Sequence, residues 1–244
     1  MKSYTIQPFR PAEYVEKFVV TAILNGTYPV GTALPNERSL ATQLGVTRPT
    51  LRETLRRLSG EGWITIRHGK PTIVNDYWFE GGLGLLGTLS RYAESLPNGF
   101  ITHLLEVRLA MLPPLARRAA SRPEPLLKHL ANAPHLTENA EVFSQFDWEL
   151  QLLMAKTSQN PVFSLILNDF AAIFSSMAVI YFSDKSARRA SQIFYEELGK
   201  ALETDPDTVE TIVKKAMEQS ISIWQQNRAH NNKDPYHAGT AARS

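Results

Sequence analysis

Cysteine is absent from this sequence and histidine is sparse. The absence of cysteine excludes disulfides, thiolate catalysis and every zinc or iron–sulfur site with cysteine ligands. None of the six histidines lies four residues from another, and a possible Asp-x-x-x-His pair that begins at Asp147 ends in Gln151 instead. The sequence patterns of a serine-hydrolase elbow, a P-loop and a zinc protease are also missing. We therefore expect no catalytic residue, no metal and no cofactor, and we do not predict an enzyme.

Signals for secretion or membrane insertion are weak. Met1–Arg10 contains no apolar core of a signal peptide. One apolar stretch, Val162–Phe182, has about the length that spans a bilayer. It carries Asn168 and Asp169 near its middle, and a carboxylate is costly in lipid. We therefore predict a helix buried in a soluble bundle, no membrane partner and a cytoplasmic protein.

Charge is distributed unevenly along the 244 residues. Residues 1–78 carry ten Lys and Arg against six Asp and Glu, whereas residues 79–244 carry sixteen against eighteen. Hydrophobic residues make up 43% of the chain, which is enough for one or two folded domains. A small basic module followed by a larger, slightly acidic one is typical of a nucleic-acid reader with a second domain.

Two short helices are predicted near the N-terminus. Residues 11–25 have helical periodicity, and their apolar face consists of Val15, Phe18, Val19, Ala22 and Ile23. Asn36 is placed to cap a second helix over 37–44, which ends at Gly45.

A third helix and a hairpin complete this part of the pattern. Thr47 is placed to cap a helix that runs to about Ser59, with a proline in its first turn. The β-rich runs 63–67 and 72–74 are predicted to pair as a hairpin. Helix, helix, glycine-containing turn, helix and hairpin together indicate a winged helix-turn-helix.

The third predicted helix has an apolar and a basic stripe. The apolar stripe consists of Leu51, Leu55 and Leu58, and the basic stripe of Arg48, Arg52 and Arg56. Such a helix enters the major groove with its N-terminal turn first, where arginines bind guanine or phosphate. At the hairpin tip, His68 and Lys70 flank Gly69, whose small size suits a close approach to a DNA backbone or minor groove.

The remaining sequence is predominantly helical in pattern. The apparent dinucleotide motif Gly82–Gly87 is followed by more helix and not by a parallel strand, so we interpret it as a linker and the first turn of a helix. Pro113 and Pro114 are expected to kink or break the second long helix. The predicted helices span 83–95, 99–121, 123–132, 138–158, 161–182, 185–203 and 206–229.

These patterns predict a mainly α protein, with an N-terminal winged helix-turn-helix and a C-terminal all-α bundle. We place the DNA-binding domain at 9–77, with its helix-turn-helix at about 37–56. A linker and connecting helix are predicted at 78–97, an all-α ligand-binding and regulatory domain at 98–230, and a disordered tail at 231–244.

Arg108 interrupts an apolar helical pattern between Val107 and Leu109. An arginine in a protein interior needs an anionic partner. A bundle that combines an apolar cavity with an arginine at its mouth suits an amphiphilic anion. Most aromatic residues of this region are expected to be ordinary core.

Two N-terminal segments carry a family resemblance. Pro35–Ala41 (PNERSLA) and Leu44–Glu53 (LGVTRPTLRE) resemble the GntR family of bacterial winged-helix regulators. Gly62–Thr72 (GWITIRHGKPT) is similar to the FadR subfamily, which regulates fatty-acid metabolism. The C-terminal resemblance is sparser and extends to about residue 229, through Asn160-Pro161, Leu165–Asn168, Tyr181-Phe182, Phe194-Tyr195, Ser220 and Ile223-Trp224.

The resemblance implies a homodimer that binds a palindromic double-stranded DNA operator. Pro49 stands where the family tends to have a polar residue, usually threonine, and it provides neither a hydroxyl nor a backbone amide for that contact. The implied DNA contacts are Arg38, Thr47, Arg48, Thr50, Arg52, His68 and Gly69.

The resemblance also implies a long-chain acyl-CoA effector in the helical domain. Met217 stands where the family tends to have glycine, and its larger side chain is expected to reshape or shorten the acyl pocket. Gln151, in place of a histidine, fits the metal-free branch of the family. The implied ligand-binding residues are Arg108, Tyr181, Tyr195, Met217, Ser220 and Trp224.

The implied function is transcriptional regulation of fatty-acid metabolism. Acyl-CoA would release the protein from DNA, with repression of fatty-acid degradation genes and activation of unsaturated fatty-acid synthesis genes. The alternative is a GntR-type regulator with a different, smaller organic acid as effector, because Arg108 would serve that ligand equally well.

Overall fold

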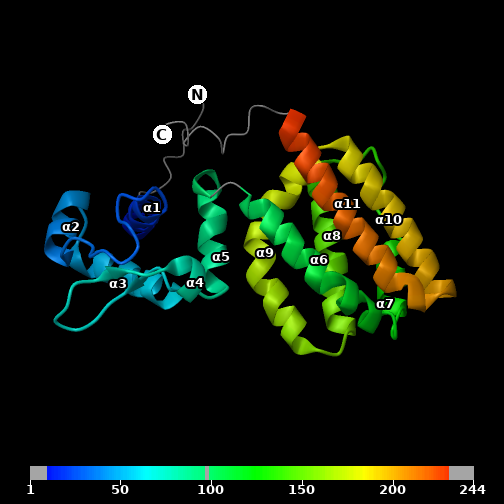
Figure 1. The fold of residues 1–244 in the computed structure, drawn as a ribbon, viewed down its shortest axis with the longest axis horizontal. Helices are drawn as coiled ribbons and strands as arrows, with labels where there is room; N and C mark the ends of the chain where they lie inside the picture. The colour runs from blue at the N-terminus through cyan, green and yellow to red at the C-terminus, as the bar shows by residue number, and fades with distance from the viewer. Residues whose placement is uncertain (1–9, 97–98, 231–244) are drawn as a thin grey trace, which may run out of the picture. The chain divides into compact units, whose positions relative to one another are not determined.

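The computed structural model describes residues 10–96 and 99–230. The chain divides into two compact units, Met1–Leu96 and Pro97–Ser244 (Figure 1). We call them unit 1 and unit 2 and describe each by itself. The predicted C-terminal tail, 231–244, lies outside the described residues.

Unit 1 begins with three helices and a two-stranded antiparallel hairpin, which confirms the winged helix-turn-helix (Figure 1). Asn36 and Thr47 cap α2 and α3, as predicted. Their side chains accept hydrogen bonds from the backbone amides of Ser39 and Thr50. Gly45 ends α2 in the left-handed conformation, at a φ of 65°. The elements are α1 (Pro11–Leu24), α2 (Glu37–Leu44), α3 (Arg48–Glu61), β1 (Ile64–Thr65) and β2 (Ile73–Val74).

Two boundaries differ from the prediction. Helix α3 continues through Gly60 to Glu61, because the left-handed residue that ends it is Gly62, at a φ of 97°. The strands are shorter than predicted, since only the Ile64–Val74 and Thr65–Ile73 pairs form the ladder. Beyond them, residues 66–71 are exposed and form the wing loop.

Three short helices follow the hairpin and belong to unit 1: α4 (Tyr77–Glu80), α5 (Gly84–Leu89) and the 3-10 helix η1 (Ser90–Ser95). We call residues 77–95 the connecting segment. The glycine-rich Gly82–Gly87 leads into α5, as predicted, and is not part of a strand–turn–helix unit. The ring of Tyr77 packs against that of Trp63 at a tilted angle, with the centroids 4.9 Å apart, so the connecting segment shares the core of unit 1.

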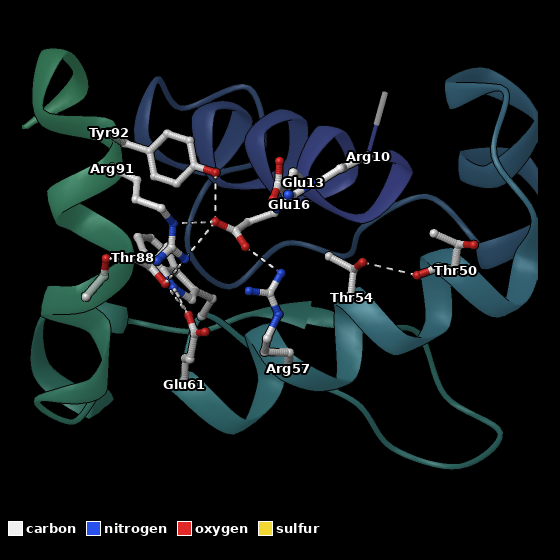
Figure 2. Close-up of polar contacts among 12 residues, drawn as sticks. Arg10, Glu13, Glu16, Thr50, Thr54, Arg57, Glu61, Thr88, Arg91 and Tyr92 are labelled. Carbon is white, nitrogen blue, oxygen red and sulfur yellow. Dashed lines mark hydrogen bonds and ion pairs between the residues drawn. The ribbon is translucent and has the colours of Figure 1, made fainter. Parts of the chain in front are cut away.

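Glu16 is an ionised side chain in the core of unit 1, and only 3% of the residue is exposed. Its Oε1 accepts hydrogen bonds from Nη2 of Arg91 at 2.8 Å and from the Tyr92 hydroxyl at 2.9 Å. Its Oε2 pairs with Arg57 (Figure 2). Burial by itself raises the pKa of Glu16. The hydrogen bonds from Arg91 and Tyr92 and the nearby guanidinium charges outweigh it, so the pKa lies below its ordinary value of 4.5.

This cluster predicts that acid weakens unit 1 through Glu16. Because its pKa is lower in the folded than in the unfolded chain, ionised Glu16 stabilises the fold at pH values above 4.5. The contribution is lost as the pH falls through the folded-state pKa. Glu16→Gln removes it, so the free energies of unfolding of native protein and variant should converge in urea titrations between about pH 7 and pH 3. A difference that stays constant over this range would contradict the assignment, and Glu13→Gln, at an exposed carboxylate, is the control.

Unit 2 is a bundle of helices, as predicted (Figure 1). Helix α11 packs along α6, and α8 packs along α9. Asn139, Asn160 and Asp184 cap α8, α9 and α10 through their side-chain oxygens. The elements are α6 (Phe100–Ala119), α7 (Glu124–Leu130), α8 (Ala140–Thr157), α9 (Pro161–Phe182), α10 (Lys185–Thr204), η2 (Pro206–Thr208) and α11 (Val209–His230).

Helix α6 runs through Pro113 and Pro114 without ending, so of the kink or break that the sequence predicted, the break does not occur. Each proline removes one amide donor from the helix. Pro113 is buried, and Leu112 and Leu115 beside the pair belong to the bundle core. Packing of α6 against α8 and α11 therefore outweighs the lost hydrogen bonds.

Helix α9 is less buried than the sequence suggested. Among the described residues it is the helix long and apolar enough to cross a membrane, by length and composition only. One of its faces packs in the bundle through Leu167, Ile173 and Phe182, whereas Leu165 is 65% exposed. The many apolar residues of α9 predicted a buried helix. Serine, asparagine and aspartate among them lie on its exposed face.

Candidate DNA interface and ligand cavity

The N-terminal turn of α3 presents a cationic edge in unit 1. Arg48, Arg52 and Arg56 are exposed, while the leucine stripe of the same helix is buried. Arg38 on α2 is exposed as well. These positions leave the guanidinium groups accessible to a phosphate backbone or to base edges.

Arg52 is held in place by an acidic neighbour. Its Nε and Nη2 both donate to Oε2 of Glu37, at 3.1 and 2.8 Å. At the start of the same helix, the hydroxyls of Thr47 and Thr50 lie 2.9 Å apart, so the cap and the second threonine form one polar group. The turn is therefore ordered before any DNA is bound.

The wing supplies the second part of this edge. His68, Gly69 and Lys70 are all exposed. Gly69 has a φ of 69°, and a Cβ built there would meet no atom within 4 Å. The backbone of the wing tip is therefore open to a close approach, and a side chain at Gly69 would be strained by conformation rather than by crowding.

A cavity opens among five helices of unit 2: α6, α8, α9, α10 and α11. It is open to solvent on one side, and the space between its lining residues, open solvent included, is about 1040 Å³. Its wall is mainly aliphatic and aromatic, with Leu104, Met111, Phe170, Phe174 and Met177 as examples. An apolar chain is the kind of group that such a wall accommodates.

A carboxylate lies at the polar end of this cavity. Oδ2 of Asp147 accepts two hydrogen bonds, from Nη2 of Arg108 at 3.3 Å and from Nε2 of Gln151 at 2.7 Å. Its other oxygen accepts from the Tyr195 hydroxyl at 3.2 Å. The anionic partner that we expected for Arg108 is thus Asp147, a residue of the protein itself. Burial, and then the charge of Asp147, raise the pKa of Tyr195 well above its ordinary value.

Three polar atoms of cavity-lining residues are buried without a hydrogen-bond partner among the described residues. They are Nε of Arg108, Nε1 of Trp224 and Oε1 of Gln151. Buried polar atoms in native proteins normally have partners, from protein, water or ligand. Two donors and one acceptor at an apolar cavity therefore match a ligand that carries hydrogen-bond acceptors together with an N–H or O–H donor.

The structure brings five of the six predicted ligand residues to the cavity wall: Arg108, Tyr181, Met217, Ser220 and Trp224. Tyr195 is not on the wall, and it reaches the site through Asp147. The Ser220 hydroxyl is already bonded to the backbone oxygen of Met217 at 2.7 Å. The sequence reading missed Asp147 as the partner of Arg108, although its spacing from Gln151 had marked both residues.

In the described part of the chain, no group of three or more His, Asp or Glu residues is placed to hold a metal ion. The carboxylate of Asp147 is occupied by three donors, and Gln151 provides one of them.

Two family models match adjacent parts of the chain. Residues 11–74 match the bacterial regulatory proteins of the gntR family, and residues 75–234 match the FadR C-terminal domain. The first match covers the helices and hairpin that carry the cationic edge. The second covers every residue that lines the cavity.

Curated relatives extend this similarity along most of the sequence. Fatty acid metabolism regulator proteins of Shewanella pealeana and Edwardsiella ictaluri are each 37% identical, over 89% and 88% of this chain and 92% and 90% of their own lengths. A solved structure of Lar, which controls expression of the Listeria monocytogenes agr system, has a TM-score of 0.59. It is 17% identical and covers 93% of this chain and 99% of its own, a likeness of fold alone.

Proposed function

Because this chain belongs to the GntR family of bacterial regulatory proteins, among the fatty acid metabolism regulators with a FadR C-terminal domain, we propose that long-chain acyl-CoA releases it from a palindromic operator. The family itself consists of DNA-binding transcription regulators. In our proposal the protein represses fatty-acid degradation genes and activates unsaturated fatty-acid synthesis genes. The observation that carries the proposal is an apolar cavity, with unpaired polar atoms on its wall, in the same chain as an exposed arginine edge.

The DNA part of the proposal is supported by the exposure of the α3 arginines and of the wing tip. Helix α3 enters the major groove with Arg48, Thr50 and Arg52, while Arg38 and Thr47 bind the backbone beside it. His68 and Gly69 contact the duplex from the wing. Because affinity rests on neutralised phosphates, operator binding should weaken steeply as salt rises.

The effector part is supported by the composition of the cavity wall. The acyl tail occupies the aromatic and aliphatic part, where burial of each methylene contributes about 0.8 kcal/mol. The carbonyl and amide groups of the effector satisfy the unpaired atoms of Arg108, Trp224 and Gln151. Tyr181 and Ser220 complete the wall.

A homodimer is part of the proposal. Phe79 is 89% exposed and Leu83 is 42% exposed, both in the connecting segment of unit 1. Exposed apolar side chains that form one patch are typical of a protein–protein contact, and these two lie four residues apart in the sequence. A two-fold dimer reads two half-sites about one DNA turn apart, which predicts a palindrome.

The experiment that tests this function uses the full chain and a library of random duplexes. Bound duplexes are selected, sequenced and then used in gel shifts with and without oleoyl-CoA. We expect a palindromic site whose complex dissociates on addition of oleoyl-CoA but not of free CoA. Failure to select any sequence, or affinity that does not vary with salt, would reject the DNA-binding function.

The second candidate is regulation by a smaller organic acid. It is favoured by the same unpaired donors, Nε of Arg108 and Nε1 of Trp224, which suit a carboxylate of any length. Calorimetry with oleoyl-CoA, octanoyl-CoA and short dicarboxylates separates the two candidates. Heat from the short acids, with none from either acyl-CoA, would replace the first proposal by the second.

Met217 is expected to limit the length of the acyl chain. It is 5% exposed and lines the cavity from α11. Replacing it with glycine removes its side chain from the wall, so longer acyl chains should gain affinity relative to shorter ones. The preference for stearoyl-CoA over octanoyl-CoA, measured by calorimetry, should rise about tenfold, the equivalent of roughly two buried methylenes. Met217→Leu, of similar volume, is the control, and an unchanged preference in Met217→Gly would contradict the role.

A further inference from the structure

Three segments of unit 1 meet at the carboxylate of Glu16, which lies on α1 (Figure 2). Arg57 reaches it from α3, and Arg91 and Tyr92 reach it from η1. Arg91 uses both Nε and Nη2, at 3.0 and 2.8 Å. A single buried side chain therefore joins the helix that carries the cationic edge to the last part of the connecting segment.

A second carboxylate makes a parallel link close by (Figure 2). Oε2 of Glu61, the last residue of α3, accepts from the Thr88 hydroxyl of α5 at 2.5 Å. The same oxygen accepts from Nε1 of Trp63 at 3.2 Å. Arg91 in turn donates to the Thr88 hydroxyl at 3.1 Å, which connects the two links.

These contacts all lie toward the C-terminal half of α3. Its N-terminal turn, with Arg48 and Arg52, makes none of them. Since α3 is a continuous helix from Arg48 to Glu61, a small displacement at Arg57 and Glu61 is carried along the helix to Arg48. The position of the C-terminal half of α3, which these contacts hold, therefore determines the position of its N-terminal turn.

We propose that Glu16 is a positioning residue for DNA recognition, which fixes α3 to the connecting segment through Arg57 on one side and Arg91 and Tyr92 on the other. The inference rests on the proposed function and deepens it. The connecting segment is the part of the chain that leads to α6, whose Ile101, Leu104 and Arg108 line the effector cavity. Glu16 is thus one of two points, with Glu61, at which the connecting segment is attached to α3.

The test compares Glu16→Gln, Arg91→Gln and Tyr92→Phe with the control Glu13→Gln. Glu13 lies on the same helix and pairs only with the exposed Arg10 in the described structure, at 2.9 Å. Tyr92→Phe and Arg91→Gln leave the Glu16–Arg57 pair intact, so they carry the test if Glu16→Gln does not fold. Hydrogen–deuterium exchange of the free full-length variants is the first measurement, and operator affinity over a range of salt is the second.

We expect amide exchange to rise together in α3 and in the connecting segment of the three variants, and not in Glu13→Gln. Operator affinity should fall about tenfold, within the range for residues that act through a network. The slope of affinity against salt should stay unchanged, because a lost phosphate contact would reduce it by about 0.9.

Two results would overturn the proposal. One is exchange that rises in only one of the two segments, and the other is operator affinity within about twofold of the native protein in folded Glu16→Gln and Arg91→Gln. A reduced salt slope in Arg91→Gln would also overturn it, because Arg91 would then be a DNA contact. If the native chain bound no duplex at all, the proposed function would fail, while the exchange measurement would still decide whether Glu16 couples the two segments.

Discussion

Arg48→Ala should weaken operator binding by about 1–3 kcal/mol, and Arg52→Ala should have an effect in the same range. Both guanidinium groups are exposed at the N-terminal turn of α3, where a base-reading side chain reaches the major groove. On the proposed function, the double variant should discriminate much less between specific and random duplexes, because it lacks both of the arginines that are proposed to read base edges. Fluorescence anisotropy with the selected operator and a scrambled duplex measures both quantities.

Arg122→Ala is the matched control, since Arg122 is an exposed arginine of unit 2. It should leave the ratio of specific to random affinity unchanged. Full discrimination in either Arg48→Ala or Arg52→Ala would show that the corresponding arginine does not read bases. An equal loss of affinity for the operator and for the scrambled duplex would instead show that this arginine contacts the phosphate backbone.

Asp147→Ala should destabilise unit 2 by about 3–5 kcal/mol, because it leaves the guanidinium of Arg108 buried without its anion. The side chains of Arg108 and Asp147 are only 17% and 8% exposed, so solvent does little to replace the lost partner. The substitution also strands the hydrogen-bond donors of Gln151 and Tyr195. Chemical denaturation followed by far-ultraviolet circular dichroism gives the free energy of unfolding.

Two further variants separate charge from packing at Asp147. Asp147→Asn keeps an oxygen that can accept a hydrogen bond from Gln151 or Tyr195. Its free energy of unfolding should therefore fall less than that of Asp147→Ala. The double variant Arg108→Met with Asp147→Leu removes both charges and should be more stable than Asp147→Ala alone. If Asp147→Ala cost less than about 1 kcal/mol, the ion pair would not be a structural requirement of the bundle.

The sequence sufficed for features that depend on local pattern. Asn36, Thr47 and Gly45 act at helix ends through their own backbone geometry, so they were identifiable without tertiary information. The apolar stripe of α3 and the exposed arginines beside it follow from helical periodicity.

Features that depend on contacts between distant segments could not be predicted from the sequence. Glu16 resembles any surface glutamate, and only the approach of Arg57 and Arg91 makes its burial possible. Asp147 lies far from Arg108 in sequence, so an arginine in an apolar stretch was assigned to an external anion. Local sequence predicts a kink or break at Pro113 and Pro114, because the stabilising effect of packing in the bundle is not visible in a local window.

The prolines of α6 also affect how this helix can move. Pro113 and Pro114 provide no amide hydrogen for the carbonyls of Leu109 and Ala110, so one turn of α6 lacks two of its longitudinal bonds. The cavity-lining part of α6, from Ile101 to Leu112, extends into this turn. The curvature of α6 can therefore change at this turn at less cost than elsewhere in the helix.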